Sequence, residues 1–350
     1  MERKLVTIQK IENLEAIPGA DRIVVATIMG WNVIVKKDEF SVGDICCFFE
    51  VDALLPDGEE WAEFMQARKF RVKTLKMKGV VSQGLALPIS ILPEKNFFQK
   101  LWRKLSGKNV WEVGEDITEI LRVTKYDVEA ASRGPGFKRG LAAGSFPPFI
   151  TKTNETRLQS AMGLLREISE HPFYVSVKCD GTSGTFYKID GELTCCSRNR
   201  KVKPGDNVYW DVATKYDLAN VLPEGYAIQA EVCGPGIQKN KLMLKEKDLF
   251  VFNVFKIKGP EYFGLFDMEE FCKKNGLKTV PIQRVVTTVD DFDCTLSNFL
   301  ELAKGKYEGT KNNKEGIVVR PLYPVKSRLF RGGRLSFKVI NNEYLLKDED

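Results

Sequence analysis

The chain is almost without histidine, since His171 is the only one among its 350 residues. A Ser-His-Asp triad or a multi-histidine metal site would have to be built around that single side chain. We therefore expect any acid–base chemistry to come from carboxylates, lysines or a bound metal ion rather than from imidazole.

Long apolar runs and glycine-rich phosphate loops are also missing. No apolar run approaches the roughly 18 residues of a membrane span, and residues 1–19 lack the apolar stretch of a secretion signal. No strand-like run is followed by G-x-G-x-x-G, and G-x-x-x-x-G-K-[ST] does not occur. These absences predict an intracellular protein, in cytoplasm, nucleus or organelle, with neither a Rossmann nor a P-loop nucleotide site.

The eight cysteines show no C-x-x-C spacing, and four of them form two Cys-Cys pairs inside strand-like runs. Neighbouring residues of a strand point to opposite faces, so such pairs are typical of buried, reduced thiols. The spacing argues against a structural zinc site and against a disulfide framework.

Residues 1–90 consist of short β-type runs separated by turn signals such as 17-IPGAD-21. This pattern predicts a small β-barrel or sandwich. The net charge of +6 permits a polyanionic partner without requiring one. The basic run 68-RKFRVKTLKMK-78 is either a solvated strand face or a surface that follows a nucleic-acid backbone. Its candidate RNA contacts are Arg68, Arg71, Lys73, Lys76 and Lys78.

Glycine, alanine, serine and proline are concentrated in residues 126–149, which indicates a linker. We expect an N-terminal domain over 1–125, a linker over 126–148 and a second domain over 149–350. In the second domain, strand-like runs in series are interrupted by a few helical segments, which predicts an α+β fold of antiparallel sheets with flanking helices. Helical spacing of apolar residues also predicts helices over 92–105 and 155–170.

Five short pieces of the second domain carry charge in a strand context. They are 178-KCDG-181, 197-SRN-199, 229-QAEVCGPG-236, 314-KEGIVVR-320 and 335-LSFKVI-340. Each piece alone is most simply a solvated strand edge. Lys178 and Asp180 would nevertheless share one face of a strand, because they are two residues apart.

A lysine nucleophile must first lose its proton, and free lysine titrates near ~10.4. Burial and a neighbouring cation lower that value, and Lys338 is the candidate cation. A divalent ion would act in the same way, and carboxylates would have to hold it. Asp180, Glu231 and Glu315 are available, and oxygen ligands without histidine favour Mg²⁺ or Mn²⁺ over zinc.

The ordered series K-x-D-G, S-R-N, E-x-x-G, K-E-G-[IV]-V and S-F-K resembles motifs I, Ia, III, IV and V of the covalent nucleotidyltransferases. That superfamily comprises polynucleotide ligases and mRNA capping enzymes. Within it, 178-KCDGTSGT-185, 231-EVCGPGIQKNK-241 and 335-LSFKVINNEYLLK-347 look most like ATP-dependent RNA ligases. A β-barrel ahead of an ATP-grasp-like ligase domain, with 82-SQGLALP-88 near the end of the barrel, resembles family 5 of those ligases. In that family the leading domain is a nucleic-acid-binding OB-fold.

The resemblance implies a role for each motif residue. Lys178 would attack the α-phosphorus of ATP and form lysyl-AMP, Lys338 would bind the α-phosphate, and Arg198 would lie near the adenylate and the ends to be joined. Asp180, Glu231 and Glu315 would hold the water shell of a catalytic Mg²⁺ or Mn²⁺. Phe252 would stack on adenine, with Phe250 as the alternative. The implied nucleotide contacts are Glu155, Arg157, Val177, Lys178, Glu231, Phe252, Glu315 and Lys338.

The implied activity is ATP-dependent, AMP-forming RNA ligation that serves RNA repair. The partner would be RNA or a nicked RNA/DNA duplex, and the enzyme would act as a monomer with no membrane and no obligate protein partner. Relatives often carry two motif V lysines that are separated by one residue. Here the corresponding positions on either side of Lys338 are Ser336 and Ile340, so Lys338 stands alone. The chain ends soon after this motif, which favours an RNA ligase over a DNA ligase or a capping guanylyltransferase. Those two enzymes and a non-catalytic RNA-binding protein remain the alternatives.

Overall fold

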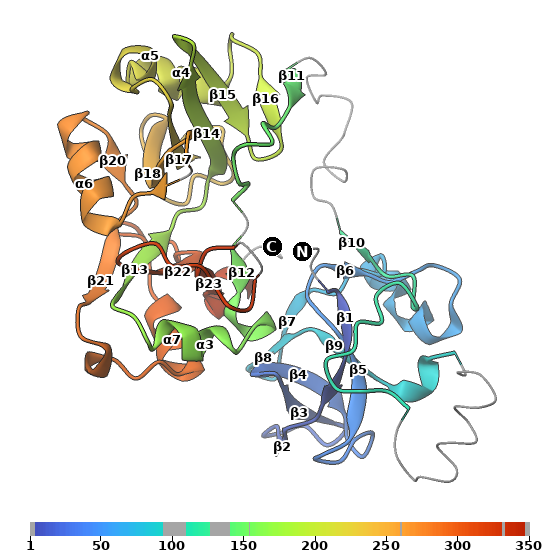
Figure 1. Cartoon of the computed structure of the whole chain (residues 1–350). Helices are drawn as coiled ribbons and strands as arrows, with labels where there is room; N and C mark the ends of the chain where they lie inside the picture. The colour runs from blue at the N-terminus through green and yellow to red at the C-terminus, as the bar shows by residue number, and fades with distance from the viewer. Residues whose placement is uncertain are drawn as a thin grey trace. The chain divides into compact units, whose positions relative to one another are not determined.

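The computed structural model describes residues 4–93, 110–126, 141–153, 155–259, 261–330 and 333–346. The chain divides into two compact units, Met1–Phe137 and Lys138–Asp350 (Figure 1). Residues 94–105 of the predicted helix and 127–140 of the predicted linker lie outside the described ranges. No helix within those ranges is long and apolar enough to cross a membrane.

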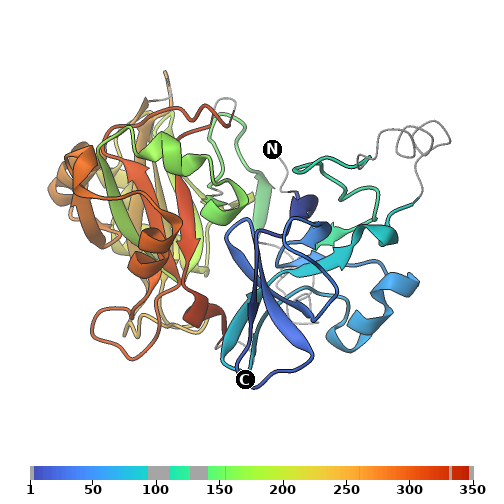
Figure 2. The same cartoon turned by 90° about the horizontal axis from the view of Figure 1, so that it is seen from below.

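The N-terminal unit is built mainly from short strands (Figure 2). The strands are β1 (Val6–Lys10), β2 (Asn13–Ala16), β3 (Ile23–Ile28), β4 (Trp31–Lys36), β5 (Ile45–Phe49), β6 (Ala53–Leu54), β7 (Thr74–Met77), β8 (Val80–Gln83), β9 (Leu85–Pro88) and β10 (Thr124–Lys125). Two 3₁₀ helices accompany them, η1 (Glu60–Arg68) and η2 (Ile89–Ile91).

The Cys46–Cys47 pair lies on β5, and its two side chains are buried on opposite faces of the strand. Cys47 and Phe49 lie in one apolar cluster, whereas Cys46 and Phe48 lie in another on the opposite side of the strand. The two faces of β5 are both buried because successive side chains of a strand alternate in direction. All eight cysteines are free and seven are buried, so the predicted burial of the thiols is confirmed.

The C-terminal unit contains two sheets. The large sheet has the strand order β11-β16-β15-β14-β17-β18-β19, and β20 (Lys278–Thr279) is added parallel to β18. Its other strands are β11 (Ala142–Ser145), β14 (Thr182–Ile189), β15 (Glu192–Ser197), β16 (Arg200–Val202), β17 (Tyr226–Cys233), β18 (Asp248–Lys256) and β19 (Glu261–Tyr262). The small sheet has the order β12-β23-β22-β13-β21. Its strands are β12 (Thr156–Arg157), β13 (Phe173–Lys178), β21 (Ile282–Val286), β22 (Gly316–Pro321) and β23 (Phe337–Ile340).

Helices cover the outer face of each sheet (Figure 1). The large sheet packs its apolar side chains against α4 (Val208–Lys215), α5 (Leu218–Val221) and α6 (Leu265–Lys274). The small sheet packs against α3 (Leu164–Ile168) and α7 (Leu296–Ala303). The shorter segments are η3 (Leu158–Ser160), η4 (Val289–Asp291) and α8 (Asn342–Leu346). This arrangement matches the expected α+β architecture of mainly antiparallel sheets.

Alternation along the strands gives the small sheet one apolar and one polar face. On β13, Phe173 and Val175 enter the core beneath α3 and α7, whereas Ser176 and Lys178 point the other way. The polar face of the small sheet is turned toward the large sheet, because Arg320 of β22 donates to the Phe252 carbonyl of β18 at 3.1 Å. The candidate site therefore lies between two sheets.

The predicted helix over 155–170 is wrong in its first half. Thr156 and Arg157 pair with Phe337 and Lys338 as the parallel strand β12, and the helix begins only at Leu164. Pairing with a distant strand overrides the helical spacing of the apolar side chains. As a result Arg157 lies beside Lys338.

Candidate active site

Lys178 is the last residue of β13 and lies opposite Gly316 of β22. Its Nζ atom is 2.7 Å from Oε2 of Glu315, and both side chains are largely buried, with 23% and 19% of their surface exposed. Burial alone would lower the pKa of Lys178, but the negative charges of Glu315 and Glu231 outweigh it and raise that pKa. Lys178 is therefore held as an ammonium ion in this state. The depression of its pKa expected from Lys338 does not occur, because the carboxylates are the stronger influence.

Tyr307 fixes the two motif residues to each other. Its hydroxyl donates to the Lys178 carbonyl at 2.8 Å and accepts from the Glu315 amide at 3.1 Å. Burial raises the pKa of Tyr307, so the bridging group stays a neutral hydroxyl. Nothing in 306-KYEGT-310 marks this tyrosine, because its partners are 8 and 129 residues away along the chain.

Gly316 allows the backbones of β22 and β23 to approach closely at this point. It has φ of +147°, and a Cβ atom would collide with the Val339 carbonyl oxygen. We expect Gly316→Ala to lower the free energy of unfolding by about 3 kcal/mol through strain and overpacking. Gly309 is the matched control, because its φ is +67° but no atom lies within 4 Å of its Cβ position. Urea unfolding should show Gly309→Ala losing only about 1 kcal/mol; equal losses would rule out the steric explanation.

Three carboxylates surround the Lys178 ammonium and influence one another. Burial and the charge of Glu315 raise the pKa of Asp180. Burial raises the pKa of Glu231 to about 7, with Glu315 and Asp180 adding to the increase against the opposing charge of Lys178. Excess negative charge of this kind would be relieved by a divalent cation, so the donor set fits the implied metal. Among the described residues no three acidic, cysteine or histidine side chains are placed to bind one ion directly.

Lys338 completes the site from β23. It pairs with Val318 on one side and with Arg157 on the other. Burial, together with the positive charges of Lys178 and Arg157, lowers the pKa of Lys338 to about 7. The amine of Lys338 therefore loses its proton easily near neutral pH. An anion bound beside it would keep it charged.

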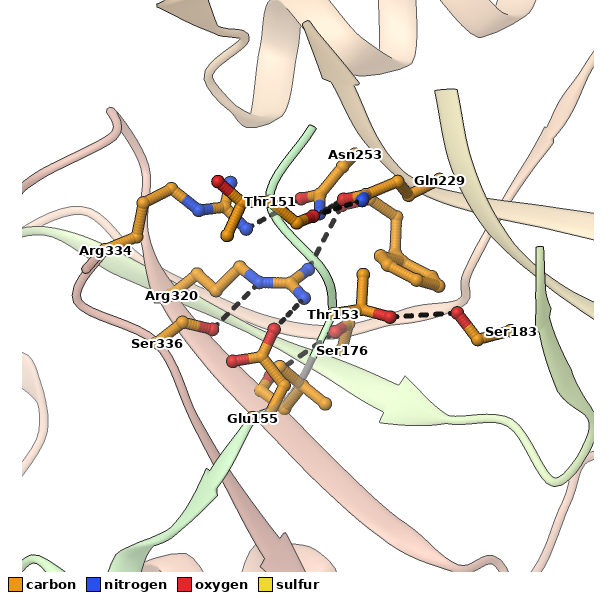
Figure 3. Close-up of polar contacts among 12 residues, drawn as sticks. Thr151, Thr153, Glu155, Ser176, Ser183, Gln229, Asn253, Arg320, Arg334 and Ser336 are labelled. Atoms are coloured by element: carbon orange, nitrogen blue, oxygen red, sulfur yellow. Dashed lines mark hydrogen bonds and ion pairs between the residues drawn. The ribbon is translucent and has the colours of Figure 1, made fainter. Parts of the chain in front are cut away.

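Ser336, one of the two positions considered for a second motif V lysine, belongs here to an ion-pair network (Figure 3). Arg320 donates from Nε to the Ser336 hydroxyl at 3.0 Å and from Nη2 to Glu155 Oε1 at 2.7 Å. Glu155 is buried, which opposes ionisation, but the charges of Arg320 and Arg334 lower its pKa to about 2. Ser336 therefore helps to hold Glu155 as a fixed carboxylate between the sheets.

A chain of amides extends this network to the large sheet. Arg334 donates to Asn253 Oδ1 at 2.9 Å, Asn253 donates to Gln229 Oε1 at 2.7 Å, and Gln229 donates to the Thr151 carbonyl at 2.8 Å. Figure 3 shows Thr151, Thr153 and Glu155 lying among these side chains. The motifs assign no role to Arg320, Arg334, Asn253 or Gln229. Polar residues inside the apolar runs YAIQAEV and LFVFNVF were the available signal.

The two candidate aromatic residues lie on β18. The register of β17 and β18 shifts between the pairs Ala230–Val251 and Gln229–Asn253, which leaves Phe252 as the extra residue of a β-bulge. Phe250 and Phe252 both pack against the small apolar cluster that contains Cys179 and Cys233. The stacking of either ring on adenine stays a prediction.

Arg198 and Val177 are less directly placed. Arg198 follows the last residue of β15, is exposed, and is one of the positive charges acting on Glu231 and Lys338. Val177 precedes Lys178, so strand alternation directs its side chain to the other face of β13. Nucleotide contacts by these two residues stay predictions.

Comparison with known proteins identifies both units. Residues 171–340 match the family model described as RNA ligase. They form an RNA ligase domain. Residues 5–89 match the model of an OB-fold domain, so the order of OB-fold and RNA ligase domain is the one expected from the motifs. Comparison with curated protein sequences gives no match.

Solved structures of Naegleria gruberi RNA ligase resemble the OB-fold and the RNA ligase domain together. A point variant with ATP and Mn is 28% identical with a TM-score of 0.80, and the match covers 99% of this chain and 100% of that one. The structure with PPi is 28% identical with a TM-score of 0.79, covering 98% of each chain. Another point variant, with AMP and Mn, is 28% identical with a TM-score of 0.80, also covering 98% of each. The family and fold predicted from the motifs are confirmed.

Proposed function

We infer that the protein is an ATP-dependent RNA ligase that works through a lysyl-AMP intermediate. The observation that carries this conclusion is the ion pair between Lys178 and Glu315 at 2.7 Å, inside an RNA ligase domain and beside Asp180 and Glu231. The relatives solved with ATP, AMP and Mn support ATP and a divalent cation as cofactors.

In the first step Lys178 attacks the α-phosphorus of ATP. A bond forms between Nζ and phosphorus, the bond from that phosphorus to the bridging oxygen breaks, and pyrophosphate leaves. Lys178 must give up a proton beforehand, and Glu315 is the hydrogen-bonded acceptor. A divalent cation held through water by Asp180, Glu231 and Glu315 would offset their negative charge, which favours the neutral amine of Lys178 over the ammonium ion. Lys338 would bind the α-phosphate and stabilise the charge on its oxygens.

In the later steps AMP moves from Lys178 to a 5′-phosphate, and a 3′-OH then attacks that end and releases AMP. Arg198 would lie beside these ends, because it is exposed and its charge reaches Glu231. We propose a nicked duplex, with RNA on the 3′-OH side, as the substrate. Nick sealing by a monomer for RNA repair is part of the same proposal.

The OB-fold would bind the RNA through a groove of about 210 Å³. Arg68 and Lys73 line this groove together with Phe64, whose side chain is 58% exposed. Exposed cations around an aromatic ring suit the phosphates and the bases of a nucleic-acid strand. Lys76 and Lys78 lie on the exposed hairpin of β7 and β8 and would add charge.

Arg71 would act differently from the other basic residues of that run. Its guanidinium is 2.8 Å from Asp52 and lies 3.9 Å from the centroid of the Tyr126 ring. We therefore propose that Arg71 shapes the OB-fold surface rather than contacting phosphate.

The test is incubation of the purified protein with α-labelled ATP or GTP and a divalent cation, followed by denaturing electrophoresis. A label from ATP alone is expected, and nicked duplexes with RNA or DNA at the 3′-OH side then identify the acceptor. A label from GTP would move the conclusion to a guanylyltransferase, and preference for a DNA 3′-OH would move it to a DNA ligase. The absence of label from both nucleotides would leave an RNA-binding protein.

Binding of ATP is expected to take up a proton at Lys338. The pKa of Lys338 is about 7 in the free protein, so the amine is mostly neutral at pH 8, and a neighbouring phosphate would raise that pKa. Proton uptake should be large at pH 8 and small at pH 5.5, where the amine is already charged. Titration calorimetry in buffers of different ionisation enthalpy, with EDTA present, measures it. Equal uptake by wild type and Lys338→Met would contradict the assignment.

A further inference from the structure

The segment between α7 and β22 folds back on itself as a hairpin. The Tyr307 amide donates to the Asn312 carbonyl at 3.0 Å, and at the base of the hairpin the Lys314 amide donates to the Gly305 carbonyl at 3.0 Å. We call residues 305–314 the Tyr307 hairpin. Because these backbone hydrogen bonds tie its two arms together, a displacement of the base would be passed on to Tyr307.

Tyr307 is the part of this hairpin that touches the catalytic motifs. Its buried hydroxyl lies between the Lys178 carbonyl at 2.8 Å and the Glu315 amide at 3.1 Å. The hydroxyl therefore sets how the backbone of the nucleophile lies relative to the backbone of its partner carboxylate. Neither hydrogen bond involves a reacting atom, so the role open to Tyr307 is positioning.

Lys314 anchors the base of the Tyr307 hairpin. Its ammonium donates to the Leu302 carbonyl at 2.9 Å and to Oε1 of Gln283 on β21. Leu302 lies in the last turn of α7, where carbonyl groups lack helical partners and carry partial negative charge. Gln283 donates to the same carbonyl at 3.0 Å. Lys314 therefore fixes the hairpin to the end of a helix and to an edge strand of the small sheet.

The end of β23 holds the same stretch of backbone. Asn341 directly follows this strand, is buried, and donates its side-chain amide to the Lys314 carbonyl at 3.1 Å. Its backbone amide donates to the Glu315 carbonyl at 2.9 Å. The peptide that joins Lys314 to Glu315 is therefore held both from α7 and from the strand that carries Lys338.

Stability alone gives a poor account of a lysine at position 314. The residue is 5% exposed, and within the described parts of the chain the hydrogen-bond partners of its ammonium are neutral. Burial of a charge against neutral acceptors is costly, whereas a methionine of similar length would fill the space without that cost. The ammonium differs from a methionine in being directional, because it reaches two fixed acceptors at once.

We propose that Tyr307 and Lys314 are positioning residues for formation of the lysyl-AMP intermediate. Lys314 fixes the Tyr307 hairpin, and the Tyr307 hydroxyl passes that position on to Lys178 and Glu315. This inference rests on the proposed ligase function. A misplacement of about 1 Å caused by a change remote from the chemistry can slow a reaction roughly a hundredfold, so the effect of losing these contacts is measurable.

Single-turnover labelling with α-labelled ATP and Mg²⁺ at pH 7, over a range of ATP concentrations, tests the proposal. We expect Tyr307→Phe and Lys314→Met each to lower the maximal rate of protein–AMP formation about tenfold or more. The ATP concentration that gives half the maximal rate should change less than about threefold, because both side chains contact the protein backbone rather than the nucleotide.

A double variant shows whether the two residues act along the same path. If Lys314 works through the Tyr307 hydroxyl, adding Lys314→Met to Tyr307→Phe should slow labelling by less than about twofold more. If the two changes merely loosen the fold independently, their effects on the rate should multiply.

Lys304→Met is the matched control for the lysine. Lys304 lies at the same end of α7, but its ammonium is exposed and pairs with Glu301 at 2.5 Å. This variant should form protein–AMP at the wild-type rate. Thermal melting of each variant is recorded, and should Lys314→Met be unfolded at the assay temperature, Lys314→Gln is measured in its place with the same expectation.

The proposal is overturned if Tyr307→Phe labels within about twofold of the wild-type rate, or if its defect lies in the ATP concentration required rather than in the maximal rate. It is also overturned if the effects multiply in the double variant, or if Lys304→Met is as slow as Lys314→Met. Failure of the ligase function itself gives a different result, since wild type would then form no protein–AMP at all.

Discussion

Replacement of Lys178 by alanine is expected to abolish protein–AMP formation, with a loss of at least about a thousandfold, because no other group replaces a covalent nucleophile. Lys178→Arg should fail equally, since arginine is not deprotonated in proteins. Binding of nicked RNA, measured by fluorescence anisotropy, should stay close to wild type because the OB-fold is unchanged. The readout is transfer of label from α-labelled ATP to protein.

Lys188→Ala is the control for this variant. Lys188 lies on β14, and its ammonium donates to the Ala219 carbonyl at 2.7 Å, outside the catalytic motifs. It should label as well as wild type. Persistent labelling of Lys178→Ala would show that another residue is the nucleophile, and loss of both labelling and RNA binding would point to misfolding instead.

Replacement of Arg320 by methionine is expected to be among the most destabilising single changes in the C-terminal unit. Arg320 and Glu155 form a buried ion pair at 2.7 Å, with only 6% and 18% of their side chains exposed. Removing one partner leaves an uncompensated buried charge, which costs about 3–5 kcal/mol. Urea unfolding at pH 7 measures the loss. Arg320→Met combined with Glu155→Gln should recover a large part of it.

The pH dependence gives a second check on the same pair. The pKa of Glu155 is about 2 in the folded protein, below its unfolded value, so its contribution to stability is complete above pH 4.5 and is lost as pH falls toward 2. Arg320→Met should remove this acid-side dependence. Arg328→Met, which breaks an ion pair with Glu170 that is 64% and 42% exposed, should change the stability far less than Arg320→Met does, because solvent screens the pair. Equal losses from both arginines would contradict the importance of burial.

The motif residues could be predicted because their order along the chain can be read from the sequence without knowledge of the fold. Lys178, Glu231 and Lys338 each interrupt or end an apolar run, Glu315 stands just before one, and each is visible in the printed sequence. The groups that hold them could not be predicted in the same way. Tyr307 acts on Lys178 from 129 residues away, and Arg320 on Glu155 from 165 residues away.

Local patterns were reliable only where no distant strand competed with them. The helical spacing near Arg157 is real, but pairing with β23 decides the conformation there. The expected lowering of the Lys178 pKa by Lys338 is outweighed for a related reason. The fold gathers three carboxylates around the same ammonium ion, and the charges of Glu315 and Glu231 raise that pKa.

Core residues and active-site residues alternate along β13. Phe173 and Val175 belong to the core, while Ser176 and Lys178 belong to the face that does the chemistry. A slip of one residue in the pairing of β13 with β22 would move the nucleophile into the core and apolar side chains into the cleft. A chain with the wrong register would lose both its core packing and its activity. Selection for catalysis therefore also maintains the register of β13.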